Sequence, residues 1–246
     1  MSPPAKRKSR SPWKRPPRKR LERIREVLRD FYGRPRNAPH HAPLDELVLT
    51  VLSQNTNDRN RDIAYNRLRK RFPTWEEVAH APLDQIEEAI KPGGISKVKS
   101  KRIKDMLGTI ERDTGSLDLE WLASPPRERA IEFLESLPGV GRKTAACVLL
   151  FSFDRAEMPV DTHVYRVSER LGLIRPKAPF EEAHDEWQAT LATLGDHDEP
   201  NPADAYELHL NLLRHGRRIC SAQRPDCAHC PLRRLCPHGK ALLARS

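Results

Sequence analysis

Four cysteines near the C-terminus constrain this chain more than any other feature of its sequence. Cys220, Cys227, Cys230 and Cys236 lie within the last 27 residues at the spacing C-x6-C-x2-C-x5-C. Disulfides would require an oxidising compartment, and no apolar signal segment is found that would direct the chain there. A C-x-x-C pair beside two further cysteines is typical of a metal or iron–sulfur site. The gaps on either side are wider than in most zinc ribbons, and zinc and a cubane cluster both stay open at this point.

Basic residues are concentrated at the start of the chain. The 246 residues carry a net charge of +10, which indicates a polyanionic partner. Nine of the 44 basic residues lie in residues 1–20, together with five prolines and no acidic residue. We expect residues 1–20 to form a disordered basic tail that contacts nucleic-acid phosphates. No apolar stretch reaches the roughly 18 residues that cross a membrane, and no membrane partner is expected.

Apolar residues recur with helical spacing along most of the chain. Behind Pro43, which favours a helix start, leucines and valines fall at positions 44, 47, 48, 51 and 52. Residues 144–151 are almost uniformly apolar, which predicts a central helix buried on all sides, with Cys147 as a core residue. No segment alternates convincingly with the two-residue period of a strand. The sequence therefore predicts an all-α fold.

A glycine-rich turn separates two of the predicted helices. Gly139 and Gly141 stand one residue apart in the sequence LPGVGRKT. The backbone N–H groups of such a turn are unobstructed and point outward at the start of the next helix, where they bind a phosphate. Glycine also occurs in helix–helix turns for geometry alone. The basic residues that follow favour a helix-hairpin-helix that holds a nucleic-acid backbone, with Gly139, Gly141, Arg142 and Thr144 as predicted DNA contacts.

Lys143 and Asp161 are the candidate catalytic residues. A lysine with an ordinary pKa of about 10.4 is almost entirely protonated at pH 7, and a nucleophilic lysine therefore needs surroundings that disfavour the ammonium form. The positive end of a helix beside Arg142 is such a place, and we expect it to lower the pKa of Lys143. Asp161 precedes an apolar helical stripe and is typical of an N-cap. Its second oxygen is free to act as an electrostatic or general-base partner.

Three motifs together resemble one known family. LPGVGRKTA, then VDTHVYRV with 18 residues from Lys143 to Asp161, then the four-cysteine pattern look like the endonuclease III family of DNA glycosylases. The resemblance implies two helical lobes with a DNA-binding cleft between them. Residues 37–155 would form a six-helix barrel with the helix-hairpin-helix, and residues 21–36 and 156–246 would form an iron–sulfur lobe.

The same resemblance assigns chemistry to these residues. It implies that the four cysteines ligate a [4Fe-4S] cluster, that Lys143 is a Schiff-base nucleophile and that Asp161 is an essential carboxylate. A member with this lysine is implied to be bifunctional: it removes a damaged base, here an oxidised pyrimidine, and nicks the abasic site by β-elimination. The expected partner is double-stranded DNA with damaged bases or abasic sites. We expect a monomer, located in the cytoplasm at the nucleoid if the source is bacterial or archaeal.

The loop at residues 53–58 is implied to fill the gap left by a flipped base. Family members commonly read S-A-Q-A-T-D here, whereas this chain reads S-Q-N-T-N-D. Asn55 therefore stands where glutamine is usual, and Gln54 stands one position earlier. Either amide is a candidate for insertion into DNA. Asp58 is expected to cap the helix that follows.

Other segments resemble the plant 5-methylcytosine glycosylases of the same superfamily. They include Gln-Asn-Thr-x-Asp in the loop at residues 53–58, residues 115–122 and residues 206–209. A glycosylase for 5-methylcytosine or for a mismatched base is therefore an alternative. A non-catalytic helix-hairpin-helix protein that binds DNA without cutting it is the alternative from another functional class.

Overall fold

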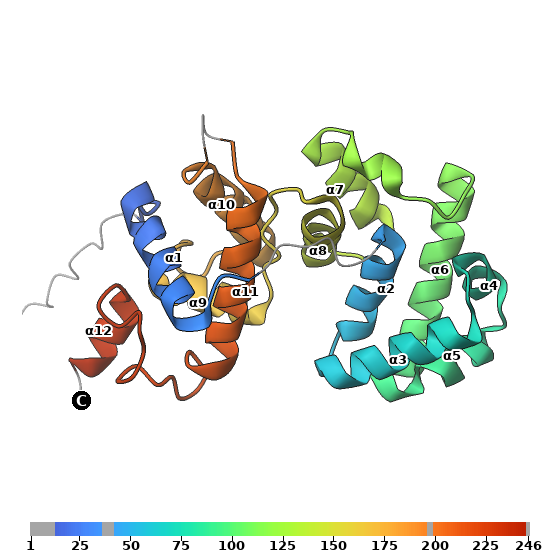
Figure 1. Ribbon diagram of the computed structural model, residues 1–246, viewed down its shortest axis with the longest axis horizontal. Coiled ribbons are helices and arrows are strands. Elements are labelled where there is room, and N and C mark those ends of the chain that lie inside the picture. Colours follow the sequence, from blue (N-terminus) through green and yellow to red (C-terminus); the bar gives the residue numbers. More distant parts are fainter. Residues whose placement is uncertain (1–12, 36–41, 196–198, 245–246) are drawn as a thin grey trace, which may run out of the picture.

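The structure, a computed structural model, describes residues 13–35, 42–195 and 199–244. Within these ranges the chain forms helices and no β-strand, which confirms the all-α prediction. No helix in the described part is long and apolar enough to cross a membrane. Figure 1 shows two groups of helices side by side, with α8 between them. The elements are α1 (Arg18–Tyr32), α2 (Pro43–Ser53), α3 (Asp58–Arg71), α4 (Trp75–His80), α5 (Leu83–Ile90), η1 (Lys91–Gly93), α6 (Ser96–Thr114), η2 (Glu120–Ala123), α7 (Arg127–Ser136), α8 (Arg142–Phe153), α9 (Thr162–Leu171), α10 (Phe180–Ala192), α11 (Pro202–Arg218) and α12 (Pro237–Leu243).

Helices α2 to α7 and one side of α8 enclose the first hydrophobic core. Its members run from Leu44 to Leu149, and Leu47, Val51 and Ile103 among them are fully buried. Helix α2 begins at Pro43, as predicted, because a proline at the first helical position loses no hydrogen bond. This core lies within the range, residues 37–155, that was given to the expected barrel lobe.

The second hydrophobic core combines both ends of the chain. Leu21, Ile24 and Leu28 of α1 pack with apolar residues from α9, α10 and α11. Figure 1 shows α1 beside α9 and α11, in the group that also contains α12 and far from α2, which follows it in the chain. At the centre, the fully buried Trp187 donates from Nε1 to Ser168 Oγ at 3.0 Å. The second lobe is therefore complete only when the two ends of the chain meet.

Helix α8 belongs to both lobes. Ala145, Val148 and Leu149 pack in the first core, whereas Leu150 packs in the second. The helix contacts α2 and α7 on one side and α10 and α11 on the other. A helix that is apolar all round is stable where it is covered all round, which explains why residues 144–150 are buried without exception.

The N-terminal segment differs in part from the expected disordered tail. Helix α1 begins at Arg18, because its apolar stripe is buried in the second core. Ahead of it, Trp13 donates from Nε1 to a backbone carbonyl of the second lobe at 3.3 Å, and Arg20 donates to two further carbonyls there. The prediction of disorder is therefore wrong for residues 13–20. The rest of the predicted tail, residues 1–12, lies outside the described residues.

A buried ion pair ties α1 to α11. Arg29 donates from Nε and Nη2 to the two carboxylate oxygens of Glu207, at 2.7 and 2.6 Å. Glu207 is only 2% exposed. A carboxylate buried to this extent depends on its partner, because water cannot replace the lost hydrogen bonds.

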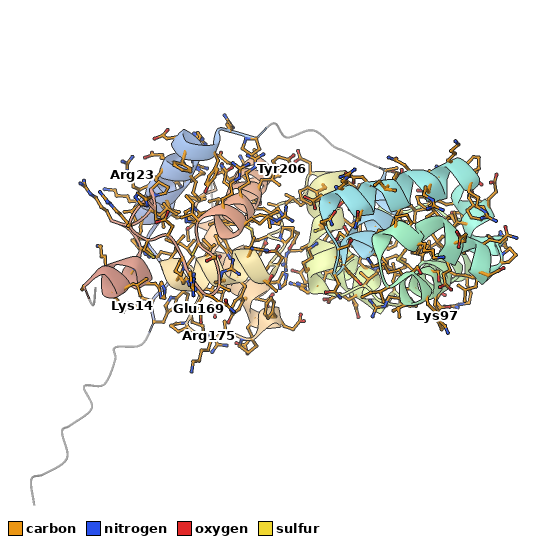
Figure 2. The ribbon with its side chains drawn as sticks, turned by 90° about the horizontal axis from the view of Figure 1, so that it is seen from below. Lys14, Arg23, Lys97, Glu169, Arg175 and Tyr206 are labelled. Carbon is orange, nitrogen blue, oxygen red and sulfur yellow. The ribbon has the colours of Figure 1, made fainter. Side chains whose placement is uncertain are left out.

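Replacing Arg29 by methionine should lower the free energy of unfolding by about 3 kcal/mol, because Glu207 would stay buried without its partner. Arg23→Met is the matched control. Arg23 lies on the outer side of the same helix (Figure 2), and its ion pair with Glu26 is exposed. The control should change the free energy of unfolding by less than about 0.5 kcal/mol. Urea unfolding followed by circular dichroism measures both, and equal losses would contradict the role given to Glu207.

Candidate functional site

A cleft of about 1160 Å³ lies between the two lobes. One wall comes from α2, α3 and the start of α8, and the other from α11 and the residues just before α9. Lys143 and Asp161, the predicted catalytic pair, both line this cleft, as do Gln54 and Asn55. The tertiary structure thus brings together side chains that lie far apart in the sequence.

Lys143 is the second residue of α8 and lies beside Cys147, one helical turn further on. Burial is the strongest influence on the pKa of Lys143 and lowers it. Cys147, Asp161 and Glu46 together outweigh burial and raise the pKa of Lys143 above its usual value. The predicted lowering of the pKa of this lysine is therefore wrong for the free protein. Lys143 carries a proton at pH 7 and needs an acceptor for it before it can act as a nucleophile.

Asp161 is the N-cap of α9, as predicted. Its Oδ1 accepts a hydrogen bond from the N–H of Val164 at 2.7 Å, which leaves Oδ2 available to the cleft. Asp161 acts electrostatically on Lys143 and on His209. The cap fixes the direction of the carboxylate relative to the lysine.

Two buried histidines hold the backbone immediately before Asp161. His209 donates from Nδ1 to the carbonyl of Pro159 at 3.0 Å, and the N–H of Val160 donates to Nε2 of His184 at 3.2 Å. Burial lowers the pKa of both histidines to about 4, and the neutral rings keep these hydrogen bonds at pH 7. No motif in the sequence marks this arrangement, because it joins α10 and α11 to the loop before α9.

Glu46 of α2 also belongs to the cleft, although no motif marks it. It is 9% exposed, and Thr50 donates from Oγ1 to its Oε1 at 3.1 Å. Burial raises the pKa of Glu46 to about 7, while Thr50, Lys143 and Arg61 counteract burial. The one signal in the sequence is that Glu46 and Thr50 are polar residues four apart, next to the apolar positions of the same helix.

The hairpin between α7 and α8 has the predicted glycine geometry. Gly139 has a φ of +79°, and a Cβ there would lie 2.8 Å from Cδ of Arg102, so that only glycine fits. Gly141 is the N-cap of α8, and no side chain caps the helix. The N–H groups that precede Thr144 in this first turn are therefore available to a phosphate.

Two of the predicted DNA contacts differ from expectation. The Arg142 guanidinium turns to Asp185 at 3.0 Å and to Glu135 at 3.9 Å. Thr144 is 4% exposed, and its N–H is used by the carbonyl of Gly141 at 2.9 Å. The Arg142 guanidinium is therefore paired with acidic side chains, and the side chain of Thr144 is buried.

The loop between α2 and α3 separates the two candidate amides. Arg102 donates from Nη1 to Oε1 of Gln54 at 2.7 Å, which occupies that amide. Asn55 adopts a φ of +51°, in the left-handed region that asparagine tolerates better than most residues. The two amides therefore differ in backbone conformation and in partners, although both line the cleft.

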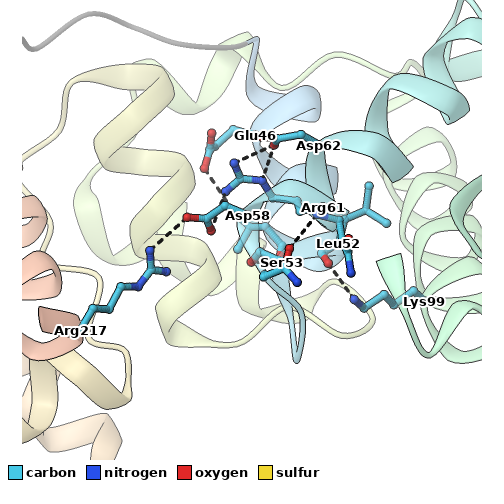
Figure 3. A network of polar contacts seen from close by, with 11 residues as sticks. Glu46, Leu52, Ser53, Asp58, Arg61, Asp62, Lys99 and Arg217 are labelled. Atoms are coloured by element: carbon cyan, nitrogen blue, oxygen red, sulfur yellow. Dashed lines mark hydrogen bonds and ion pairs between the residues drawn. The ribbon is translucent and has the colours of Figure 1, made fainter. Parts of the chain in front are cut away.

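The start of α3 corrects the predicted cap. Asn57, not Asp58, is the N-cap, and its Oδ1 accepts from the N–H of Asn60 at 2.9 Å. Asp58 instead accepts from Nη1 of Arg217 at 3.0 Å. Figure 3 shows Arg217 reaching from α11 to this carboxylate, so that an ion pair joins the two lobes.

The four cysteines of the predicted metal site line one small cavity in the second lobe. Arg170 donates from Nη1 to Cys220 Sγ at 3.2 Å, and the N–H of Gly239 donates to Cys236 Sγ at 3.3 Å. Burial and the neighbouring thiols raise the pKa of Cys230 to about 11, so that four thiolates need a positive centre. In the described ranges, no three potential ligands converge closely enough for a single metal ion. Four cysteines around one cavity have the donor chemistry of a metal or iron–sulfur site.

His215 supports this cavity from α11. The Tyr32 hydroxyl lies 3.1 Å from Nδ1 of His215, and Nε2 of the ring lies 3.5 Å from Cys230 Sγ. Burial lowers the pKa of His215 to about 4, so that the ring is neutral at pH 7 and has one N–H to donate. A hydrogen bond to a ligating sulfur is a usual element of a metal site's surroundings.

Comparison with known proteins shows to which family the chain belongs. Residues 48–191 match the HhH-GPD superfamily of base excision DNA repair proteins. The chain is 33% identical over 215 residues to endonuclease III of Thermotoga maritima, a match that covers 87% of this chain and 91% of that protein. The chain belongs to the HhH-GPD superfamily. The resemblance to endonuclease III is thereby confirmed.

Some plant relatives of this HhH-GPD protein are much longer. The Arabidopsis thaliana protein named transcriptional activator DEMETER is 35% identical over 173 residues, 67% of this chain but only 9% of that protein. This chain therefore spans about a tenth of such relatives. Relatives named endonuclease III and DNA glycosylase/AP lyase support the prediction of an enzyme.

A solved structure shows the same fold in contact with DNA. The structure of a trapped endonuclease III–DNA covalent intermediate matches with a TM-score of 0.69 and 30% identity, over 91% of this chain and 98% of that chain. The predicted two-lobed helix-hairpin-helix fold is consistent with this match.

Gly216 brings α11 close to the start of α9 in this HhH-GPD protein. A Cβ at Gly216 would lie 2.8 Å from Cβ of His163 and 3.3 Å from its Cα. His163 follows Asp161 by two residues. A side chain at position 216 would push His163 away from α11, and the carboxylate of Asp161, which caps α9, would move with it.

Gly216→Ala should therefore destabilise the protein by about 1–3 kcal/mol through overpacking, and should slow any reaction that needs Asp161. Gly108→Ala is the control, because Gly108 lies inside α6 with nothing within 4 Å of a new Cβ. That change should leave activity intact and stabilise the protein by up to about 1 kcal/mol. Thermal unfolding and a DNA-nicking assay measure both; a tolerated Gly216→Ala would show that the approach of the two helices is not needed.

Proposed function

We propose that this protein is a bifunctional DNA glycosylase and AP lyase of base excision repair, which removes damaged pyrimidines and then nicks the abasic site. The observation that carries the proposal is the position of Lys143. It lies at the start of α8 in the cleft, under the electrostatic influence of Asp161. A lysine amine forms a Schiff base with a sugar carbon, which a glycosylase that uses only water does not do.

Binding begins at the hairpin in this proposal. The N–H groups at Gly139, Gly141 and the first turn of α8 hold one phosphate and fix the register of the DNA. A base inside a duplex is out of reach of the cleft, and the nucleotide must therefore be flipped out of the stack. Asn55 and Gln54 lie at the rim of the cleft, where an amide can fill the space that the base leaves.

The reaction then takes place between Lys143 and Asp161. The neutral amine of Lys143 attacks C1′, the bond from C1′ to the base breaks, and the electron pair leaves with the base. The free oxygen of Asp161 stabilises the positive charge that develops on the sugar. The C1′–O4′ bond of the sugar ring then breaks, O4′ takes up a proton, and the amine nitrogen forms an imine with C1′. The imine acidifies the C2′ hydrogens, and loss of one of them expels the 3′ phosphate by β-elimination.

Cys220, Cys227, Cys230 and Cys236 would hold a [4Fe-4S] cluster in the second lobe. Four thiolate ligands leave no open position, and the cluster would therefore supply structural cross-linking between the end of α11 and α12. The residues around the cavity, Arg170 and His215, donate hydrogen bonds that would stabilise bound thiolates.

A second candidate substrate is 5-methylcytosine or another modified or mismatched base. The observation that favours it is the 35% identity to DEMETER over 173 residues, which make up 9% of that protein. The chemistry at Lys143 would be the same, and only the base pocket would differ.

Borohydride should trap a covalent adduct between the wild-type protein and a duplex that contains an abasic site. Lys143→Ala should abolish the adduct, because borohydride reduces the imine that only this amine forms. Asp161→Asn should lower the rate about 10²-fold or more while DNA binding persists. An undiminished adduct in Lys143→Ala would refute the assignment of the nucleophile, and binding without any adduct in the wild type would favour the non-catalytic alternative.

The purified protein should contain about four irons per chain and no stoichiometric zinc. Cys227→Ser should lose iron and lower the melting temperature, since the cluster cross-links the end of the second lobe. Cys147→Ser is the control, because Cys147 lies on α8, away from the cavity. Metal analysis of the wild type, Cys227→Ser and Cys147→Ser measures the iron and zinc content per chain. One tightly bound zinc per chain in the wild type would contradict the cluster.

A further inference from the structure

Glu46 lies on the same wall of the cleft as Lys143, the proposed nucleophile. It lies on α2, which packs closely against α8, and it lines the same cleft as Lys143 and Asp161. The two charges act on each other: Lys143 lowers the pKa of Glu46, and Glu46 raises the pKa of Lys143. Glu46 is the buried carboxylate of α2, whose other buried positions are apolar apart from Thr50.

The hydrogen bonds and ion pairs of the Glu46 carboxylate are weak for a buried group. Thr50, a neutral hydroxyl, is the side chain that donates to it, at 3.1 Å. The guanidinium of Arg61 on α3 lowers the pKa of Glu46, but it forms ion pairs with Asp62 at 2.7 Å and with Asp58 at 3.5 Å (Figure 3). Buried carboxylates that serve stability have a close cationic partner, as Glu207 has in this protein. Glu46 therefore has the properties of a group that reacts rather than one that supports the fold.

Asp161 is less suited to move a proton. One of its oxygens caps α9 at 2.7 Å, and the backbone before it is held by two neutral histidines. Transfer of a proton to Asp161 would weaken this cap. The two carboxylates therefore divide the work, with Asp161 fixed for electrostatic stabilisation and Glu46 free to exchange a proton.

We propose that Glu46 is a second catalytic carboxylate, which accepts the proton of the Lys143 ammonium and returns it to the group that leaves C1′. The inference rests on the proposed function, because it takes Lys143 as the nucleophile. An N–H bond of Lys143 breaks as the O–H bond of Glu46 forms. The amine then bonds to C1′, and the leaving group departs with the electron pair and takes the proton from Glu46. On an abasic site the leaving group is a hydroxyl, which departs as water, and no oxidant or reductant is needed.

The electrostatic surroundings agree with this role. Burial raises the pKa of Glu46 to about 7, so that its carboxylate can both accept and return a proton at neutral pH.

Other charged groups lie on the helices around Glu46. Lys99 of α6 lies at the other end of α2, where it donates to the carbonyls of Leu52 and Gly93 at 2.7 and 2.8 Å. The titratable and charged groups that face the cleft around Glu46 are Lys143 and Cys147 from α8, Asp58, Arg61, Asp62 and Tyr65 from α3, Asp161 and His163 at the start of α9, and Tyr206, His209, Arg214 and Arg217 from α11.

The test measures single-turnover nicking of an abasic duplex between pH 5 and pH 9. In the wild type the rate should rise with pH through a midpoint near 7, because Glu46 must be deprotonated to accept a proton. Glu46→Gln should lower the rate at pH 8 about 10²-fold and remove this limb of the profile. Thr50→Val should move the limb to higher pH, because the Thr50 hydroxyl lowers the pKa of Glu46.

The outcomes separate this inference from the proposed function. A wild-type protein that forms no borohydride adduct with the abasic duplex overturns both. A normal adduct together with an unchanged rate and profile in Glu46→Gln overturns the role of Glu46 alone. If Glu46→Gln does not fold, the profile of Thr50→Val decides, because a merely structural Glu46 predicts no shift of the limb.

Discussion

The burial of α8 on all sides is the constraint on which the rest of the structure depends. Its side chains contribute to two hydrophobic cores at once, and the helix cannot move in one lobe without disturbing the other. Lys143 is the second residue of this helix, so that the proposed nucleophile is held by an element that packs in both cores. The hairpin glycines precede it directly, which would couple the proposed binding of a phosphate to the position of the amine.

The cleft holds more negative charge around Lys143 than its sequence neighbourhood shows. Glu46 comes from α2 and Asp161 from the N-cap of α9, and both stabilise the ammonium form of the lysine. Arg142, the cationic neighbour in the sequence, turns away to Asp185 and has no such effect. A nearby residue in the sequence is therefore a poor guide to the pKa of a side chain, because the sign of the field is set by groups that folding brings in from other helices.

Most of the fold was predictable from local patterns. The apolar period, Pro43 at the start of α2 and the Asp161 cap all appear as expected, because each depends on a few neighbouring residues. The misplaced cap at Asp58 and the misjudged segment at residues 13–20 have another cause. A segment rich in proline and arginine has no local reason to be ordered, and residues 13–20 are ordered because carbonyls of the second lobe accept their hydrogen bonds.

The sequence by itself determined the helical class, the family and the identities of the lysine, the aspartate and the four cysteines, since these reside in short motifs with fixed spacing. Only the tertiary structure decided which charges surround Lys143, that Glu46 is buried in the same cleft, and that two neutral histidines hold the backbone before Asp161. The physical reason is that motifs record what is covalently near. Burial and electrostatic energy depend on distances through space, which exist only once the two cores have formed around α8.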